Sequence, residues 1–178
     1  MYKRLTAFIS EVATGPAPVT LLHSMSWLNE EYTARAAAQV ADSVAISSDE
    51  RDAVALASAW LRGHRRGMLA PFAVGTIDQA LLAALAVKHN ALRMLGLAGK
   101  VLVVDEAHAY DAYMQALLRR LLTWLGKLGC PVVLLSATLP SAVSTSLVEA
   151  YLRGTGRDGV GGAGYRVEYP GWLFVPAD

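Results

Sequence analysis

The sequence predicts an α/β fold in which helices cover both faces of a parallel β-sheet. Two short apolar runs without alternation, 101–104 and 132–135, flank a segment with helical periodicity. Strands that are apolar on both sides are typical of parallel sheets buried on two faces. Two such strands joined by a helix form a right-handed crossover. We therefore expect residues 101–135 to form the centre of the fold.

The amino-terminal part is predicted to begin with a helix over 2–12, where apolar residues recur at helical spacing. The continuous apolar run 19–22 then predicts a buried strand. The patterns that follow indicate a helix over 27–40, a brief strand over 44–46 and a helix over about 50–61.

The middle of the chain contains a second strand, a short helix and the long central helix. Apolar residues 72–75 predict the strand, and Thr76 or Asp78 opens a helix that we expect to reach about Val87. The central helix begins at Asp111, and Gly126 and Gly129 are expected to end it. Its apolar stripe consists of Met114, Leu117, Leu118, Leu121, Leu122 and Leu125.

The carboxyl-terminal part is predicted to hold one last helix, over about 142–152. Residues 154–164 are rich in glycine and predict a flexible loop, and residues 165–175 look extended. We therefore expect a main domain over 1–152 and a loop-and-tail segment over 153–178.

Composition indicates one soluble globular unit. Hydrophobic residues make up 54% of the 178 residues, charged residues make up 17%, and the formal net charge is +1. Any nucleic-acid contact must then be local. The single cysteine, Cys130, is expected to be a buried structural thiol. No apolar stretch is long enough to cross a bilayer, so we expect a cytoplasmic protein without membrane contact.

Polar residues follow both central strands. Asp105-Glu106-Ala107-His108 ends the first strand and Ser136-Ala137-Thr138 ends the second. The carboxyl ends of neighbouring parallel strands share the ligand-binding edge of a sheet. Nucleotide hydrolysis needs a carboxylate that holds Mg²⁺ and a second group that orients water, and adjacent acids can divide these roles. The alternatives are solvated charges at a strand exit and an ordinary helix-entry turn.

Several segments in this order resemble the DEAH-box branch of superfamily two helicases, and more narrowly the CRISPR-associated helicase-nuclease of type I interference systems. These segments are 21–24, 70–79, 100–111, 131–140 and 169–172. The resemblance implies the first RecA-like domain, of the P-loop NTPase type. It also implies an ATP-dependent DNA helicase or translocase that acts in antiviral defence.

The resemblance assigns roles to the strand-end residues. Asp105 corresponds to the acid that holds magnesium and Glu106 to the residue that activates water. His108 would sense the γ-phosphate, and Ser136 and Thr138 resemble the motif that couples hydrolysis to movement.

The resemblance also implies nucleic-acid contacts. Gly75, Thr76 and Gln79 correspond to residues that contact the backbone of single-stranded DNA, and His23 lies in an early segment of the same kind. Glycine and a hydroxyl at a helix start can offer backbone N–H groups to phosphate. The alternative is a glycine turn before a capped core helix.

One expected motif is missing from the 178 residues. ATP-driven helicases hold phosphates with Gly-x-x-x-x-Gly-Lys-[Ser/Thr], and the pairs Gly99-Lys100 and Gly126-Lys127 do not fit this pattern. We therefore expect the RecA-like fold to be incomplete at its amino terminus. ATP and magnesium belong to the complete family, and this chain alone is expected to be inactive and to bind neither tightly.

Three interpretations stay open. The chain is a fragment of the helicase, a non-catalytic module that binds single-stranded DNA or docks on another protein, or a decayed gene product. The basic cluster that ends in Arg65 and Arg66 supports the second. The CRISPR RNA-guided surveillance complex is an implied partner of the full-length family, and unpaired sheet edges predict self-association.

Overall fold

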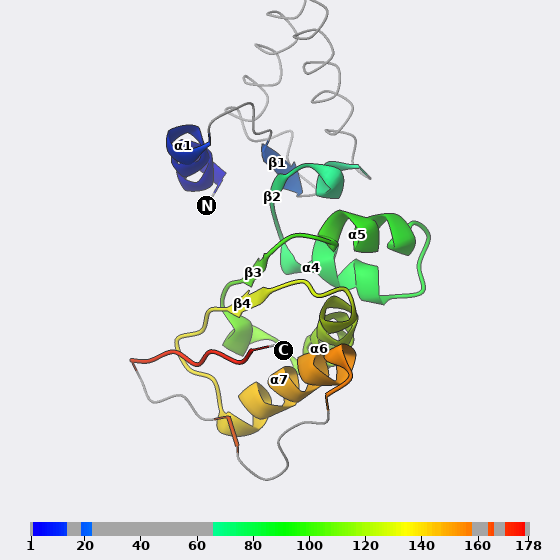
Figure 1. Cartoon of the computed structure of the whole chain (residues 1–178), viewed down its shortest axis with the longest axis vertical. Coiled ribbons are helices and arrows are strands. Elements are labelled where there is room, and N and C mark those ends of the chain that lie inside the picture. Colours follow the sequence, from blue (N-terminus) through cyan, green and yellow to red (C-terminus); the bar gives the residue numbers. More distant parts are fainter. Residues whose placement is uncertain (1, 14–18, 23–65, 158–163, 166–169, 177–178) are drawn as a thin grey trace, which may run out of the picture. The chain divides into compact units, whose positions relative to one another are not determined.

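A computed structural model of the chain describes residues 2–13, 19–22, 66–157, 164–165 and 170–176 (Figure 1). The chain divides into two compact units, Met1–Gln79 and Ala80–Asp178. The elements predicted over 27–40, 44–46 and 50–61 lie outside the described residues.

The described residues of the first unit include helix α1 and one pair of strands. Helix α1 covers Tyr2–Val12 and strand β1 covers Val19–Leu22. A short 3₁₀ helix, η2 (Gly67–Leu69), precedes strand β2 (Phe72–Gly75). Strands β1 and β2 pair in parallel from Val19↔Phe72 to Leu22↔Gly75. The helix predicted over 2–12 and the strands predicted over 19–22 and 72–75 are confirmed.

Burial explains the pairing in the first unit. Thr20 is the buried residue of β1, and its hydroxyl donates to the carbonyl oxygen of Gly67 at 2.6 Å. A buried hydroxyl needs such a partner, because an unpaired one costs about 1–3 kcal/mol. This bond ties β1 to the turn that leads into β2.

The described residues of the second unit include a second pair of strands and several helices. Helix α4 (Ile77–Leu81) spans the boundary between the units and continues into the 3₁₀ helix η3 (Leu82–Ala84). The remaining elements are α5 (Asn90–Leu97), β3 (Leu102–Val104), η4 (Ala107–Ala109), α6 (Ala112–Lys127), β4 (Val132–Leu134) and α7 (Ser141–Thr155).

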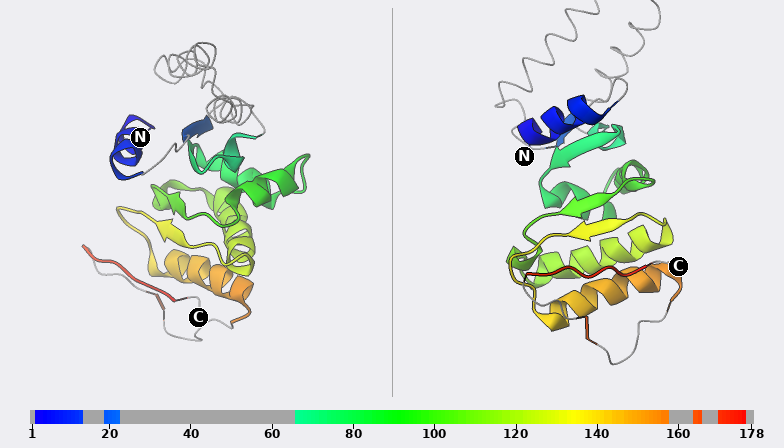
Figure 2. Two further views of the ribbon diagram at one scale, coloured as in Figure 1. Left: turned by 45° about the horizontal axis from the view of Figure 1, so that its top comes forward. Right: turned by 60° about the vertical axis from the view of Figure 1, so that its left-hand side comes forward.

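Strands β3 and β4 pair in parallel, with Leu102 opposite Val132 and Val104 opposite Leu134. Because α6 connects them, the predicted strand-helix-strand unit is confirmed. Helices α6 and α7 lie side by side next to this strand pair (Figure 2). The described strands thus form two separate two-stranded parallel sheets, and the fold class is α/β with an incomplete sheet.

The core of the second unit lies between α6, α7 and the residues before β4. Its largest fully buried side chains are Leu118, Leu121, Leu122, Leu125, Leu147 and Cys130. Most of the predicted stripe of α6 is therefore confirmed as core, and so is the buried thiol. On the strands, Val103 and Val133 are paired neighbours and are 54% and 42% exposed.

The prediction needs four corrections, which are three wrong boundaries and one helix that was missed. The helix expected to reach Val87 ends at Leu81, and 3₁₀ geometry takes over as Ala83 and Ala84 become buried. Helix α5 was not predicted. The final helix extends to Thr155, so the loop begins at Gly156 instead of Gly154.

The fourth correction concerns Gly126, which lies buried inside the last turn of α6 and does not end that helix. Gly129, with φ of +63°, follows the helix end in the left-handed region that favours glycine. In the described part of the tail, residues 170–176 contain no helix or strand. No helix among the described residues is long and apolar enough to span a membrane.

Candidate functional site

The backbone joins the ends of β3 and β4 beyond the strands themselves. The Leu135 N–H donates to the Val104 carbonyl at 2.8 Å, and the Ala107 N–H donates to the Leu135 carbonyl at 3.0 Å. The residues after β3 and those after β4 therefore share one edge. We call the set of Asp105, Glu106, His108, Ser136 and Thr138 the strand-end rim.

Asp105 begins the rim and is held by its neighbours. Its carboxylate Oδ1 accepts the Glu106 N–H at 3.0 Å, and its carbonyl accepts the Tyr110 hydroxyl at 3.0 Å. The residue is exposed, so its side chain is accessible to solvent or a ligand.

Glu106 adopts the left-handed conformation, with φ of 55° and ψ of 40°. This region costs a residue with a side chain about 1–2 kcal/mol relative to the right-handed one. Non-glycine residues in such conformations cluster at functional sites. The turn at Glu106 leads directly into η4, which carries His108.

His108 links the two strand ends. Its Nδ1 lies 3.1 Å from the Ser136 hydroxyl oxygen and 3.3 Å from Glu106 Oε2. The Ser136 hydroxyl donates its single proton to the Thr138 carbonyl at 3.0 Å. The donor and acceptor roles of His108 and Ser136 depend on the tautomer of the ring, and with the hydroxyl proton on that carbonyl, the hydroxyl oxygen accepts from a protonated Nδ1. That N–H is then shared between Ser136 and the Glu106 carboxylate.

The rim can contribute ligands to a metal ion but cannot enclose one. The described residues contain no group of three or more His, Cys, Asp or Glu side chains placed to hold a metal. Mg²⁺ in nucleotide-hydrolysing sites is commonly held by one or two carboxylates together with substrate phosphates and water. Asp105 and Glu106 supply carboxylates, the kind of ligand that such a site uses.

The segment after β2 belongs to the other unit and serves a packing role. A Cβ on Gly75 would lie 2.7 Å from both the Cβ and the carbonyl oxygen of Leu22, so only glycine fits beside β1. The Thr76 N–H donates to the Leu22 carbonyl at 3.4 Å. That backbone donor is therefore engaged within the protein, contrary to its expected availability for phosphate.

Of the other residues predicted to contact nucleic acid, three are described by the structure and two are not. The Thr76 hydroxyl belongs to an exposed residue, and Gln79 is half-buried in the five-residue helix α4. Arg66 is half-buried at the start of η2. His23 and Arg65 lie outside the described residues.

Several Cas3 proteins are similar in sequence to this chain. The chain is 40% identical over 152 residues to the CRISPR-associated endonuclease/helicase Cas3 of Thermus thermophilus, covering 85% of this chain and 16% of that protein. It is 48% identical over 97 residues to the CRISPR-associated nuclease/helicase Cas3 of Streptococcus thermophilus, covering 54% and 10%. The chain is homologous to a segment of the Cas3 helicase/nucleases.

Solved structures agree with this homology to Cas3. The crystal structure of T. fusca Cas3-AMPPNP matches 99% of this chain and 19% of that chain with a TM-score of 0.79 and 49% identity. A chain of the CRISPR RNA-guided surveillance complex in a pre-nicking state matches 94% of this chain and 18% of its own length, with a TM-score of 0.59 and 42% identity. No family model matches.

The homology confirms the resemblance and the fold class predicted from the sequence. The chain spans less than a fifth of the length of these relatives. The sequence did not reveal a cluster of basic side chains on α6 and α7, because its members come from two helices and form no linear motif.

Proposed function

We propose that this chain is part of an ATP-dependent DNA helicase or translocase that acts in CRISPR antiviral defence. The observation that carries the proposal is the link between the two strand ends through His108 and Ser136, with Asp105 and Glu106 beside it. The named helicase activity of the Cas3 relatives supports the reaction class.

In this proposal the rim divides the chemistry among its side chains. Asp105 holds Mg²⁺ together with the nucleotide phosphates, and Glu106 orients the attacking water. His108 senses the γ-phosphate. Ser136 and Thr138 transmit the change, because a shift of the Glu106 carboxylate alters the N–H that His108 shares with Ser136.

DNA contact is assigned to the segment after β2. The close approach of Gly75 to β1 fixes the backbone there, and this leaves the Thr76 hydroxyl exposed beside it. We propose that this hydroxyl and the Gln79 side chain contact the backbone of single-stranded DNA. The surveillance complex is the proposed protein partner, as the relative in the pre-nicking complex suggests.

The 178-residue chain alone is proposed to be inactive. It contains no Gly-x-x-x-x-Gly-Lys-[Ser/Thr] sequence, so the backbone donors and the lysine that hold the polyphosphate in such enzymes are not supplied. Steady-state ATP hydrolysis in the presence of Mg²⁺ and single-stranded DNA should stay at the level of buffer. Turnover that disappears in the Glu106→Gln variant would contradict this part of the proposal.

The rim itself is tested in a chimaera. Residues 100–140 of this chain replace the aligned residues of Thermus thermophilus Cas3, and DNA-stimulated ATP hydrolysis is measured. Asp105→Asn and Glu106→Gln should each lower kcat by about 100-fold or more, because each removes a charge that acts on the transferred phosphate or the attacking water.

Two further variants distinguish a loss of chemistry from general damage to this segment and from a loss of coupling between hydrolysis and strand displacement. Asp111→Asn changes a carboxylate of the same segment that lies outside the rim, and it should leave kcat within about twofold. Ser136→Ala should retain hydrolysis but lower strand displacement per ATP consumed. Equal loss of hydrolysis in the Asp111 and Glu106 variants would remove the proposed roles.

A further inference from the structure

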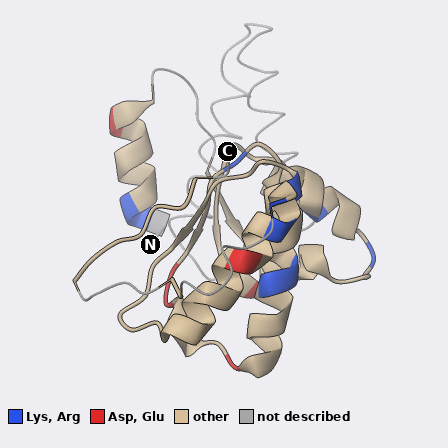
Figure 3. Ribbon diagram, turned by 60° about the horizontal axis from the view of Figure 1, so that its bottom comes forward, with Lys and Arg blue, Asp and Glu red and all other residues tan. Residues whose placement is uncertain are grey.

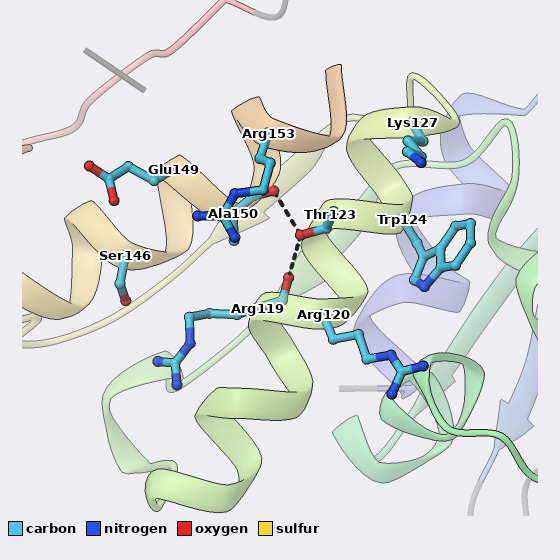
Figure 4. Close-up of a pocket in the computed structure, with 9 residues that line it drawn as sticks. All are labelled: Arg119, Arg120, Thr123, Trp124, Lys127, Ser146, Glu149, Ala150 and Arg153. Carbon is cyan, nitrogen blue, oxygen red and sulfur yellow. Dashed lines mark hydrogen bonds between the residues drawn. The ribbon is translucent and has the colours of Figure 1, made fainter. Parts of the chain in front are cut away.

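Residues of helices α6 and α7 line an open pocket of about 550 Å³ that contains no residue of the rim. Its charged and aromatic lining residues are Arg119, Arg120, Trp124, Lys127, Glu149 and Arg153 (Figure 4). Four of these side chains are cations and one is a carboxylate. We call this set the basic groove, and Figure 3 shows how Lys and Arg gather along these helices.

Helix packing creates the groove. A Cβ on Gly126 would lie 2.2 Å from the Tyr151 carbonyl oxygen, and one on Gly154 would lie 2.1 Å from the Thr123 carbonyl oxygen. The two backbones therefore touch at their carboxyl-terminal ends. The Thr123 hydroxyl bridges them further, with the Ala150 carbonyl at 2.9 Å.

Basic residues of both helices line this one pocket. Arg120, Trp124 and Lys127 recur at intervals of four and three and so occupy one face of α6. In Figure 4 Arg119 and Arg153 lie on the side of α6 that faces α7, whereas Arg120, Trp124 and Lys127 lie on its other side, and all five line the same open pocket. The groove begins about 12 Å along α6 from its cap Asp111, since eight residues rise about 1.5 Å each.

Few contacts with the described residues neutralise the cations of the groove. Across the described residues, no salt bridge or side-chain hydrogen bond engages the guanidinium groups of Arg119, Arg120 and Arg153. Lys127 lies over the Trp124 ring at 5.5 Å from its centroid. Lys127 and Arg153 lie in the last turns of their helices, where a cation is stabilised by the helix dipole. Arg119 and Arg120 lie well before the last turn of α6, so the dipole does not account for them.

We propose that the basic groove binds the sugar-phosphate backbone of a single-stranded nucleic acid, with a base stacked on Trp124. Grooves of this class combine cations that follow the phosphates with an exposed aromatic ring that accepts any base. Trp124 is 44% exposed and lies among the cations. An acidic protein segment would use the cations but would gain little from the ring. The proposed helicase function does not require this site.

The first test measures how salt weakens binding of a labelled oligothymidylate of about 10 nucleotides to the complete 178-residue chain. For single strands, log K falls with log salt by about 0.7 per neutralised phosphate. The triple variant Arg119→Gln, Arg120→Gln, Arg153→Gln should therefore lower that slope by about 2. Lys88→Gln removes an exposed cation outside the groove and should not change the slope.

The second test measures the contribution of the Trp124 ring to binding. Binding of the oligothymidylate should quench the fluorescence of Trp124, and Trp124→Leu should lose that quenching and weaken binding by about tenfold. Circular dichroism checks that the variants stay folded. A triple variant with an unchanged slope would overturn the proposal. Oligoglutamate or inorganic phosphate that competes as well as unlabelled oligothymidylate would also overturn it, in favour of an acidic protein or a simple anion.

Discussion

Alanine at Gly126 or Gly154 should destabilise the protein, although alanine is the better helix former. Either Cβ would overlap a carbonyl oxygen of the opposite helix at 2.2 or 2.1 Å. A backbone oxygen cannot rotate away as a side chain can. The helices must therefore separate by about 1 Å to restore ordinary van der Waals contact, and this loosens the buried leucines between them.

The two opposing terms have comparable size. Replacing glycine by alanine inside a helix gains about 1 kcal/mol. Overpacking a closed contact costs about 1–3 kcal/mol, and separating a leucine-rich interface places the cost at the upper end. We expect each variant to lose about 2 kcal/mol net, which corresponds to a fall in Tm of about 4–8 °C for a chain of this size.

Thermal and urea unfolding followed by circular dichroism measure this effect. Ala116→Gly, at an exposed position of α6, is the matched control and should cost about 1 kcal/mol through helix propensity alone. A Gly126→Ala variant with a higher Tm than the parent would refute the reasoning, because it would mean that the two helices are free to adjust.

Three further outcomes can be measured in the same way. Asp111→Ala should cost about 1 kcal/mol, because the carboxylate accepts the Met114 N–H at 2.8 Å and caps α6. Tyr151→Phe should cost about 1 kcal/mol at neutral pH, because the hydroxyl donates to the Cys130 carbonyl at 3.1 Å. Burial first, and the nearby Cys130 second, raise the pKa of Tyr151 from 10.0, so the unfolded chain ionises before the folded one. The parent should therefore lose stability as pH rises above about 10, and Tyr151→Phe should lack that contribution. Glu106→Gly should raise the free energy of unfolding by about 1 kcal/mol by relieving the left-handed backbone; a decrease in urea midpoint would contradict this.

The central part of the fold could be predicted because its pattern is unambiguous. The continuous apolar runs predicted β3 and β4. The apolar stripe predicted α6, and its members Leu118 and Leu125 are fully buried. Parallel pairing then placed Ser136 beside the residues after Asp105. The strand-end rim follows from topology, so it could be inferred before its distances were known.

Other elements depend on tertiary contacts that the sequence does not display. The apolar residues around Ala83 and Ala84 predict a continuing helix, but their burial against neighbouring helices ends it in a 3₁₀ turn. Helix α5 follows His89, whose φ is 68°, and it leaves Leu95 64% exposed, so its apolar pattern is hard to recognise in the sequence. The basic groove needs the packing of Gly126 against α7.

At Glu106 the residue that is best for folding stability differs from the residue that the proposed chemistry needs. A carboxylate there is kept at an energetic disadvantage, since glycine would occupy the same backbone angles with less strain. Random mutation to glycine would therefore make the folded chain more robust while it removed the proposed water-orienting acid. Without selection for activity, the stability of the fold would not oppose the loss of this glutamate. Its presence is therefore explained by a role of its side chain and not by folding.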